Sequence, residues 1–209
     1  MRILLADDHA VVRHGLKQIL ADEFKRAVFG EARNAQEALS LIWKENWDVV
    51  VLDITMPGRS GLEVLREIRK SKPKLPVLVL SMHPENQFAV RVLKRGASGY
   101  MTKESAPDEL VGAIKKVLAG GRYVSTSLAE KLATYLSTDT QKPAQELLSD
   151  REFQVLRLIA SGKIVSEIAR ELSLSVKTIS TYRTRILEKM ELRTSAELIH
   201  YAVVNKLVS

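Results

Sequence analysis

The chain has 209 residues, of which 45% are hydrophobic and 27% charged, and its formal net charge is +7 at pH 7. This composition excludes a mainly disordered chain and fits one large or two ordinary globular domains, with a basic excess that permits attraction to a polyanion. The absence of cysteine excludes disulfides, thiolate metal sites and cysteine nucleophiles, and it fits a reducing cytoplasm.

The start of the chain, MRILLADDH, does not resemble a targeting segment. Its apolar run, ILLA, is too short for the apolar region of a signal peptide. No stretch of the chain approaches the length of a transmembrane helix. We therefore expect a cytoplasmic protein without a membrane partner.

Short apolar runs alternate with amphipathic stretches over residues 1–122. The runs RILLA, AVFGEA, VVVLD, PVLVLS and SGYM are predicted strands, because continuous apolar runs of roughly four to six residues fit strands covered on both faces. Helical patterns lie at Val11–Leu20, Ala35–Lys44, Gly61–Arg69, Asn86–Lys94 and Pro107–Leu118. This alternation predicts an α/β domain with a doubly wound, five-stranded parallel sheet.

Residues 123–146 differ in character and are interpreted as a partly helical linker. Leu128, Leu132 and Leu136 have helical spacing, and the polar stretch STDTQKPAQE follows them. Beyond the linker, residues 147–209 are predicted to be a small all-α domain.

Four helices are predicted in this last domain. Ser149 and Glu152 form a capping box at the start of the first helix, and Gly162 closes it. The others are Val165–Leu172, Val176–Met190 and Ser195–Asn205. A three-residue turn between the middle pair is typical of a helix-turn-helix module.

Five polar residues follow the predicted strands: Asp7, Asp8, Asp53, Ser81 and Lys103. Each alone is more often a turn, cap or surface residue, but the carboxyl ends of parallel strands bring all five to one edge. Three carboxylates in one place require a divalent cation, and oxygen ligands suit Mg²⁺. Asp53 is the predicted nucleophile towards a phosphoryl group, whose charge Lys103 would neutralise.

The segments ADDH at 6–9, LDITMPGRSG at 52–61, LSMH at 80–83 and GYMTK at 99–103 resemble the flavodoxin-like receiver domain of two-component response regulators. The resemblance implies that Asp8 and Asp53 bind Mg²⁺ directly, with Asp7 acting through water and the carbonyl of Thr55 as a further ligand. It also implies that Asp53 accepts a phosphoryl group from a sensor histidine kinase. Ser81 would close onto that group, Tyr100 would be the aromatic switch, and Lys103 would pair with the phosphoryl group.

The predicted helix from Val176 is basic on one side. The stretch 172–187 contains Lys177, Arg183 and Arg185 and no acidic residue. Its inward face is predicted to consist of Val176, Ile179, Ile186 and Tyr182. Such a helix fits the major groove of DNA, although any three basic residues can also form a solvated helix face.

Residues 148–192 resemble the LuxR-type helix-turn-helix of the NarL/FixJ response regulators. The resemblance implies that Ser180, Thr181 and Thr184 contact bases, and that Lys177, Arg183 and Arg185 contact phosphates or adjacent bases. Two departures are expected to matter. Ile164, Val165 and Ser166 replace a polar cap and a lysine, which weakens the cap, and Ser180 and Tyr182 replace a common lysine and histidine, which alters the operator preference.

The resemblances together imply a transcription regulator of a two-component system. Phosphorylation of Asp53 would control dimerisation and the binding of promoter DNA, with RNA polymerase as a further partner and no enzymatic activity beyond slow self-dephosphorylation. One alternative is a magnesium-dependent phosphatase of the haloacid dehalogenase type, but Thr55 occupies the position of its second acid. The other is a DNA-binding protein whose receiver no longer uses phosphate.

Overall fold

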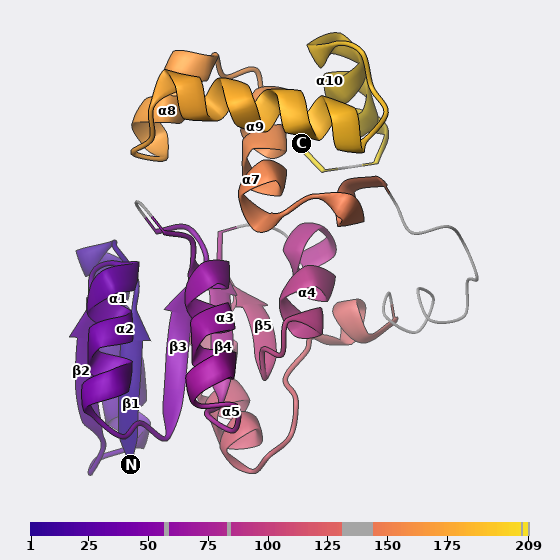
Figure 1. Ribbon diagram of the computed structural model, residues 1–209. Helices are drawn as coiled ribbons and strands as arrows, with labels where there is room; N and C mark the ends of the chain where they lie inside the picture. The colour runs from indigo at the N-terminus through magenta and orange to yellow at the C-terminus, as the bar shows by residue number, and fades with distance from the viewer. Residues whose placement is uncertain (57–58, 83–84, 131–143, 206, 209) are drawn as a thin grey trace. The chain divides into compact units, whose positions relative to one another are not determined.

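The computed structural model describes residues 1–56, 59–82, 85–130, 144–205 and 207–208. The chain divides into two compact units, Met1–Thr138 and Asp139–Ser209, which we call the N-terminal and C-terminal units. The first is α/β and the second is helical (Figure 1). Within the described ranges, no helix is long and apolar enough to cross a membrane.

A parallel sheet forms the centre of the N-terminal unit, with the strand order β2-β1-β3-β4-β5. The strands are β1 (Arg2–Ala6), β2 (Val28–Ala32), β3 (Val49–Asp53), β4 (Val77–Ser81) and β5 (Gly99–Thr102). Every residue of β3 and β4 is buried, which explains their uninterrupted apolar sequence. The predicted doubly wound parallel sheet is confirmed.

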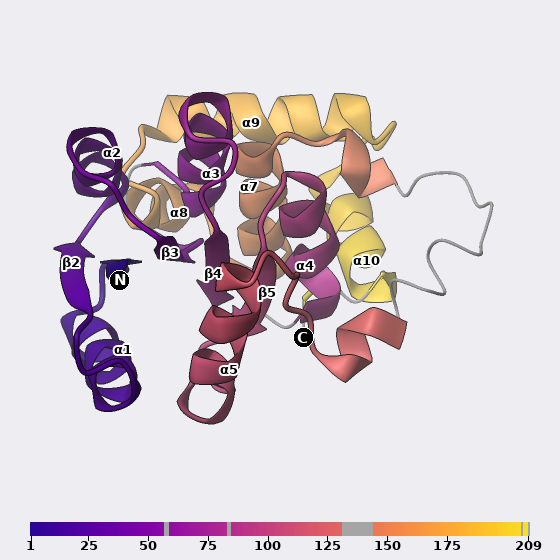
Figure 2. The ribbon, with the colours of Figure 1, turned by 90° about the horizontal axis from the view of Figure 1, so that it is seen from below.

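Helices cover both faces of this sheet, with α1 and α5 on one face and α2 and α3 on the other (Figure 2). The helices are α1 (Ala10–Glu23), α2 (Ala35–Lys44), α3 (Gly61–Ser71), α4 (Glu85–Lys94) and α5 (Ala106–Leu118). Alternate strand residues point to the same face, so Ile3 and Leu5 of β1 pack in one cluster with Leu110 and Ile114 of α5. Burial of each such side chain contributes about 2 kcal/mol to the stability of the fold. These contacts fix where each strand ends relative to its neighbours.

The loop after Asp53 is held close to the sheet by Gly61 and Ser60. A Cβ atom on Gly61 would lie 2.1 Å from the carbonyl oxygen of Asp53, so glycine alone fits there. The Ser60 side chain accepts a hydrogen bond from the backbone N–H of Glu63 and caps α3. These two residues begin α3 directly beside the end of β3.

The C-terminal unit contains α7 (Asp150–Ala160), α8 (Val165–Glu171), α9 (Val176–Lys189) and α10 (Ser195–Val204), after a short 3₁₀ helix at Ala144–Leu147. Helix α9 packs on α7 and α8, and α10 packs on α7. The predicted capping box is present, because Ser149 and Glu152 each accept a hydrogen bond from the other's backbone N–H. Gly162 ends α7 with φ of +86°, as its position predicted.

The predicted linker is described in part. Residues 126–130 are helical, and Leu128 is fully buried. Leu132 and Leu136, on which the predicted helical spacing also depends, lie outside the described residues.

Two helices of the C-terminal unit end on non-glycine residues in the left-handed conformation. Ser173 after α8 has φ of 54°, and Glu191 after α9 has φ of 56°. At both ends the next residue donates a backbone hydrogen bond back into the last turn, Leu174 to Ala169 and Leu192 to Leu187. A side chain in this conformation carries a steric penalty that glycine avoids.

We expect the substitution Glu191→Gly to stabilise the C-terminal unit by about 0.5–1 kcal/mol, because it removes this strain at an exposed helix end. Chemical denaturation followed by circular dichroism measures the change. Glu191→Ala is the matched control, since it removes the same charge and keeps the strain. Equal stabilisation by both variants would show that the charge matters and the backbone conformation does not.

Candidate acidic pocket and nucleic-acid interface

Residues from three strands meet at the carboxyl edge of the sheet. Asp7 follows β1, Asp53 ends β3, and Lys103 follows β5. The Lys103 Nζ atom lies 2.6 Å from Asp7 Oδ2 and 2.7 Å from Asp53 Oδ2. The predicted convergence of these three residues is therefore present in the fold.

Local hydrogen bonds fix the second oxygen of each carboxylate. Asp7 Oδ1 accepts from the backbone N–H of His9 at 2.8 Å, and Asp53 Oδ1 accepts from that of Thr55 at 2.9 Å. Asp7 and Asp53 are only 2% and 1% exposed. Each carboxylate is thus held through Oδ1 by its own loop, and its Oδ2 atom contacts Lys103.

The pocket holds more negative than positive charge. Burial raises the pKa of Asp53 to about 6, and the neighbouring Lys103 only partly offsets this effect. For Lys103, burial favours the neutral amine, but Asp53 and Asp7 outweigh it and raise the pKa of the ammonium group. One cation therefore stays charged between two carboxylates, and the pocket can stabilise a further positive charge.

Among the described residues, Asp7, Asp8, His9 and Asp53 each offer a ligand atom within 4.8 Å of the others. Asp7 Oδ2 and Asp8 Oδ1 are buried and, in the described part of the chain, accept no well-aligned hydrogen bond. Asp7 Oδ2 lies 2.6 Å from Lys103 Nζ and Asp8 Oδ1 lies 2.9 Å from His9 Nδ1. Three neighbouring carboxylates with so little hydrogen bonding fit a hard divalent cation such as Mg²⁺. The residues present therefore suit the predicted metal.

His9 was not among the predicted site residues. Its Nδ1 atom lies 2.9 Å from Asp8 Oδ1 and 3.4 Å from Asp7 Oδ1, and its side chain is 62% exposed. The signal was its position directly after the two aspartates, but sequence alone does not show that the ring turns back towards them. The carbonyl of Thr55 as a metal ligand stays a prediction, and the backbone N–H of Thr55 donates to Asp53 Oδ1.

Ser81 and Tyr100 are both fully buried. Ser81 ends β4, and its carbonyl accepts a hydrogen bond from the backbone N–H of Lys103 at 2.8 Å, so the ends of β4 and β5 are tied together. The Tyr100 ring lies inside the unit in this structure. Its role as a switch stays a prediction.

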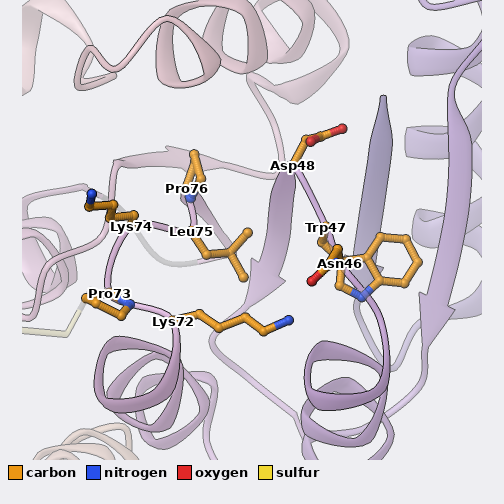
Figure 3. A pocket seen from close by; sticks show the side chains of 8 residues that line it. All are labelled: Asn46, Trp47, Asp48, Lys72, Pro73, Lys74, Leu75 and Pro76. Atoms are coloured by element: carbon orange, nitrogen blue, oxygen red, sulfur yellow. The ribbon is translucent and has the colours of Figure 1, made fainter.

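A separate hollow of about 460 Å³ lies at the opposite edge of the sheet (Figure 3). It is lined by Asn46, Trp47, Asp48, Lys72, Pro73, Lys74, Leu75 and Pro76. These residues precede β3 and β4 and include none of the predicted site residues. Reactive groups gather at the carboxyl edge instead, as in other open parallel sheets.

The predicted DNA-contacting residues all lie on α9, and all are exposed: Lys177, Ser180, Thr181, Arg183, Thr184 and Arg185. Ile179 and Ile186 are fully buried and Tyr182 is half-buried, as predicted for the inward face. The prediction for Val176 was wrong, because this side chain is 53% exposed. Val176 is the first helical residue, where the side chain points back beyond the packed turns.

Several polar groups of α9 are already oriented. Arg183 Nε donates to the hydroxyl of Ser195, at the start of α10, at 2.7 Å. The hydroxyls of Thr181 and Thr184 donate to the carbonyls of Lys177 and Ser180, at 2.9 and 3.2 Å. The cationic face of α9 is thus partly preorganised.

The scaffold around α9 shows one predicted weakness and one contact that was not predicted. Ile164 at the start of α8 offers no side-chain acceptor, and only Glu167 caps this end, through Ile164 N–H at 2.9 Å. Lys189 near the end of α9 bonds the buried Glu152 at 2.6 Å. Burial favours the neutral form of Glu152, but Lys189 and Ser149 outweigh this effect and lower its pKa.

Comparison with known proteins gives relatives that match this chain over nearly the whole length of both sequences. The response regulator GacA of Pseudomonas aeruginosa is 38% identical over 209 residues, which is 100% of this chain and 98% of the relative. The response regulator UvrY of Escherichia coli K12 is 36% identical over 204 residues, 97% of this chain and 94% of the relative. RcsB of Salmonella enterica serovar Typhimurium, solved bound to promoter rprA in the presence of the phosphomimetic BeF₃⁻, has a TM-score of 0.65 at 28% identity, with 97% of this chain and 98% of RcsB covered.

Two family models divide the chain between them. Residues 3–115 match the response regulator receiver domain. Residues 146–202 match the luxR family of bacterial regulatory proteins. The acidic pocket lies in the first match and α9 in the second. The chain belongs to the two-component response regulators that join a receiver domain to a LuxR-type DNA-binding domain.

Proposed function

We propose that Asp53 accepts a phosphoryl group from a sensor histidine kinase in the bacterial cytoplasm, and that this group controls dimerisation and promoter binding. The observation that carries the proposal is the position of Asp53 Oδ2, which is buried at a strand end and 2.7 Å from Lys103 Nζ. On the predicted boundaries, 1–122 is the receiver, 123–146 the linker and 147–209 the DNA-binding domain.

The chemistry is transfer to a carboxylate. An oxygen of Asp53 attacks phosphorus, the bond between phosphorus and the donor nitrogen breaks, and the imidazole of the kinase leaves with a proton. Lys103 neutralises charge on the phosphoryl oxygens, and the Ser81 hydroxyl donates to one of them. Asp7, Asp8, Asp53 and the Thr55 carbonyl would hold Mg²⁺, which supplies electrostatic stabilisation of the phosphoryl oxygens when bound.

The stored group is lost by slow hydrolysis in this proposal, and the protein is not a turnover enzyme. In the phosphatase alternative, a second acid would assist the leaving group and water. Thr55 stands at that position, and its backbone N–H bonds Asp53 Oδ1. This arrangement favours storage over turnover.

The output is the basic face of α9 in the major groove of DNA. Ser180, Thr181 and Thr184 contact bases, while Lys177, Arg183 and Arg185 hold phosphates or adjacent bases. RcsB has been solved as dimers bound to DNA, which supports a two-fold arrangement with half-sites about one helical turn apart. Bound in this way at a promoter, the protein would act on RNA polymerase.

Incubation with Mg²⁺ and acetyl phosphate is expected to add one phosphoryl group to Asp53, the carboxylate that ends the central strand β3 and contacts Lys103. Intact-mass and peptide-mass measurements locate the label. Asp53→Asn should give none. Rapid multiple turnover would favour a phosphatase, and an unlabelled wild-type protein would favour a receiver that no longer uses phosphate.

Asp53→Asn is also expected to stabilise the N-terminal unit in magnesium-free buffer. The folded pKa of about 6 lies above the ordinary value of 3.8, so the stability contributed by protonated Asp53 is complete below pH 4 and lost as pH rises through 6. The gain should reach about 3 kcal/mol at pH 7.5 and about half of that at pH 5. Urea unfolding at both pH values measures it.

Magnesium should reduce this difference, because it binds the folded wild-type pocket more tightly than the variant. Repeating the unfolding with millimolar Mg²⁺ is the control. A variant that is less stable than wild type without Mg²⁺, at either pH, would contradict the raised pKa of buried Asp53.

Arg183→Ala is expected to weaken operator binding about tenfold. It should also lower the slope of log affinity against log salt concentration by about one, because one fewer counterion is released on binding. Ser195→Ala should weaken it only two- to threefold, because it removes the hydrogen bond that orients Arg183 and keeps the charge. Electrophoretic mobility or fluorescence anisotropy at several salt concentrations measures both. Arg26→Ala, which removes an exposed cation of the N-terminal unit, should leave binding unchanged.

A further inference from the structure

The chain returns to the sheet after α5 and pairs with the free edge of β5. Tyr123 N–H donates to the carbonyl of Ser98 at 2.9 Å, and Tyr100 N–H donates to the carbonyl of Tyr123 at 3.3 Å. These bonds form a parallel bridge between Gly99 and Tyr123. Tyr123 therefore acts as a single-residue edge strand beside β5.

The pairing depends on a close approach at Gly99. A Cβ atom on Gly99 would lie 2.8 Å from both the Cβ and the carbonyl oxygen of Tyr123, and 2.9 Å from a methyl group of Leu78. Only glycine leaves room for backbone at these distances. The sequence of β5 thus accommodates the returning chain.

Further contacts fix the same segment. The Tyr123 hydroxyl donates to Glu109 Oε2 on α5 at 2.5 Å, and its ring packs against the core between α5 and the sheet. Two residues later, the Ser125 side chain accepts from the N–H of Leu128 at 3.1 Å and begins the helical residues 126–130. The chain is therefore held at Tyr123 and enters the next segment in a defined direction.

Strand β5 also carries two residues of the proposed phosphorylation response. Tyr100 lies on it, Lys103 follows it, and Lys103 Nζ contacts Asp53. The amide of Tyr100 itself bonds Tyr123. A displacement of β5 cannot occur without moving or breaking these bonds.

We propose that Tyr123 is a positioning residue that couples β5 to the linker, so that phosphorylation of Asp53 reaches the DNA-binding unit through this backbone pairing. The inference rests on the proposed function, because it requires that phosphorylation raise DNA affinity. Under this proposal the start of the linker is part of the switch. A linker that is only a tether would transmit nothing through Tyr123.

A matched pair of variants in the full-length protein isolates the backbone bond. Tyr123→Pro removes the N–H that donates to Ser98, and Tyr123→Ala removes the same ring and keeps that N–H. Gly99→Ala tests the pairing independently from the other strand. For each protein, mass spectrometry gives the label on Asp53, and anisotropy gives the ratio of DNA affinity with and without acetyl phosphate.

Wild type is expected to gain about tenfold in affinity on phosphorylation. Tyr123→Ala should keep this gain within twofold, whereas Tyr123→Pro and Gly99→Ala should lose most of it while Asp53 stays fully labelled and the affinity of the unlabelled protein is unchanged. Full labelling with a wild-type gain in both disruptive variants would overturn the proposal.

Amide hydrogen exchange separates this inference from the proposed function. Phosphorylation should change the protection of the Tyr100 and Tyr123 amides together, in the absence of DNA. Labelled wild type with no gain in DNA affinity would contradict the proposed function. The hydrogen-exchange result would then be the sole test of the coupling between β5 and Tyr123. A change at Tyr100 with none at Tyr123 would overturn the coupling.

Discussion

The N-terminal unit is organised around an incompletely neutralised charge. Lys103 Nζ lies between Asp7 Oδ2 and Asp53 Oδ2, at 2.6 and 2.7 Å, in a place where both carboxylates are almost inaccessible to water. Two buried acids with one base are costly unless further positive charge arrives. Burial of the same cluster raises the pKa of Asp53, and the excess of carboxylates makes the pocket suitable for a cation.

The fold maintains this unfavourable cluster by securing its parts separately. The apolar strands set where Asp53 and Lys103 end up, and the close approach at Gly61 holds the loop behind Asp53. The backbone hydrogen bond from Lys103 N–H to the Ser81 carbonyl holds the ends of β4 and β5 in register. Stability contributed by the apolar core thus offsets the electrostatic cost of the charge cluster at the carboxyl edge of the sheet.

Much of this arrangement could be predicted from sequence, because a parallel sheet places all strand ends together. The uninterrupted run VVVLD fixed both the burial of β3 and the position of Asp53. Contacts that depend on side-chain direction could not be predicted. The return of His9 towards Asp8, the exposure of Val176 at the first turn of α9, and the bond from Lys189 to Glu152, 37 residues away, leave no periodic signal. The pairing of Tyr123 with β5 is made by backbone groups, so it too leaves no signal in the sequence pattern.

Two of the three threonines of α9, Thr181 and Thr184, are restricted in the base edges that they could recognise in the proposed DNA complex. Each hydroxyl gives its single hydrogen to a backbone carbonyl of its own helix, Thr181 to Lys177 and Thr184 to Ser180. While those bonds persist, only lone pairs and methyl groups face outwards. These two side chains would complement the amino groups of adenine and cytosine and the methyl group of thymine, and would leave donation to O6 or N7 of guanine to the other polar residues of α9.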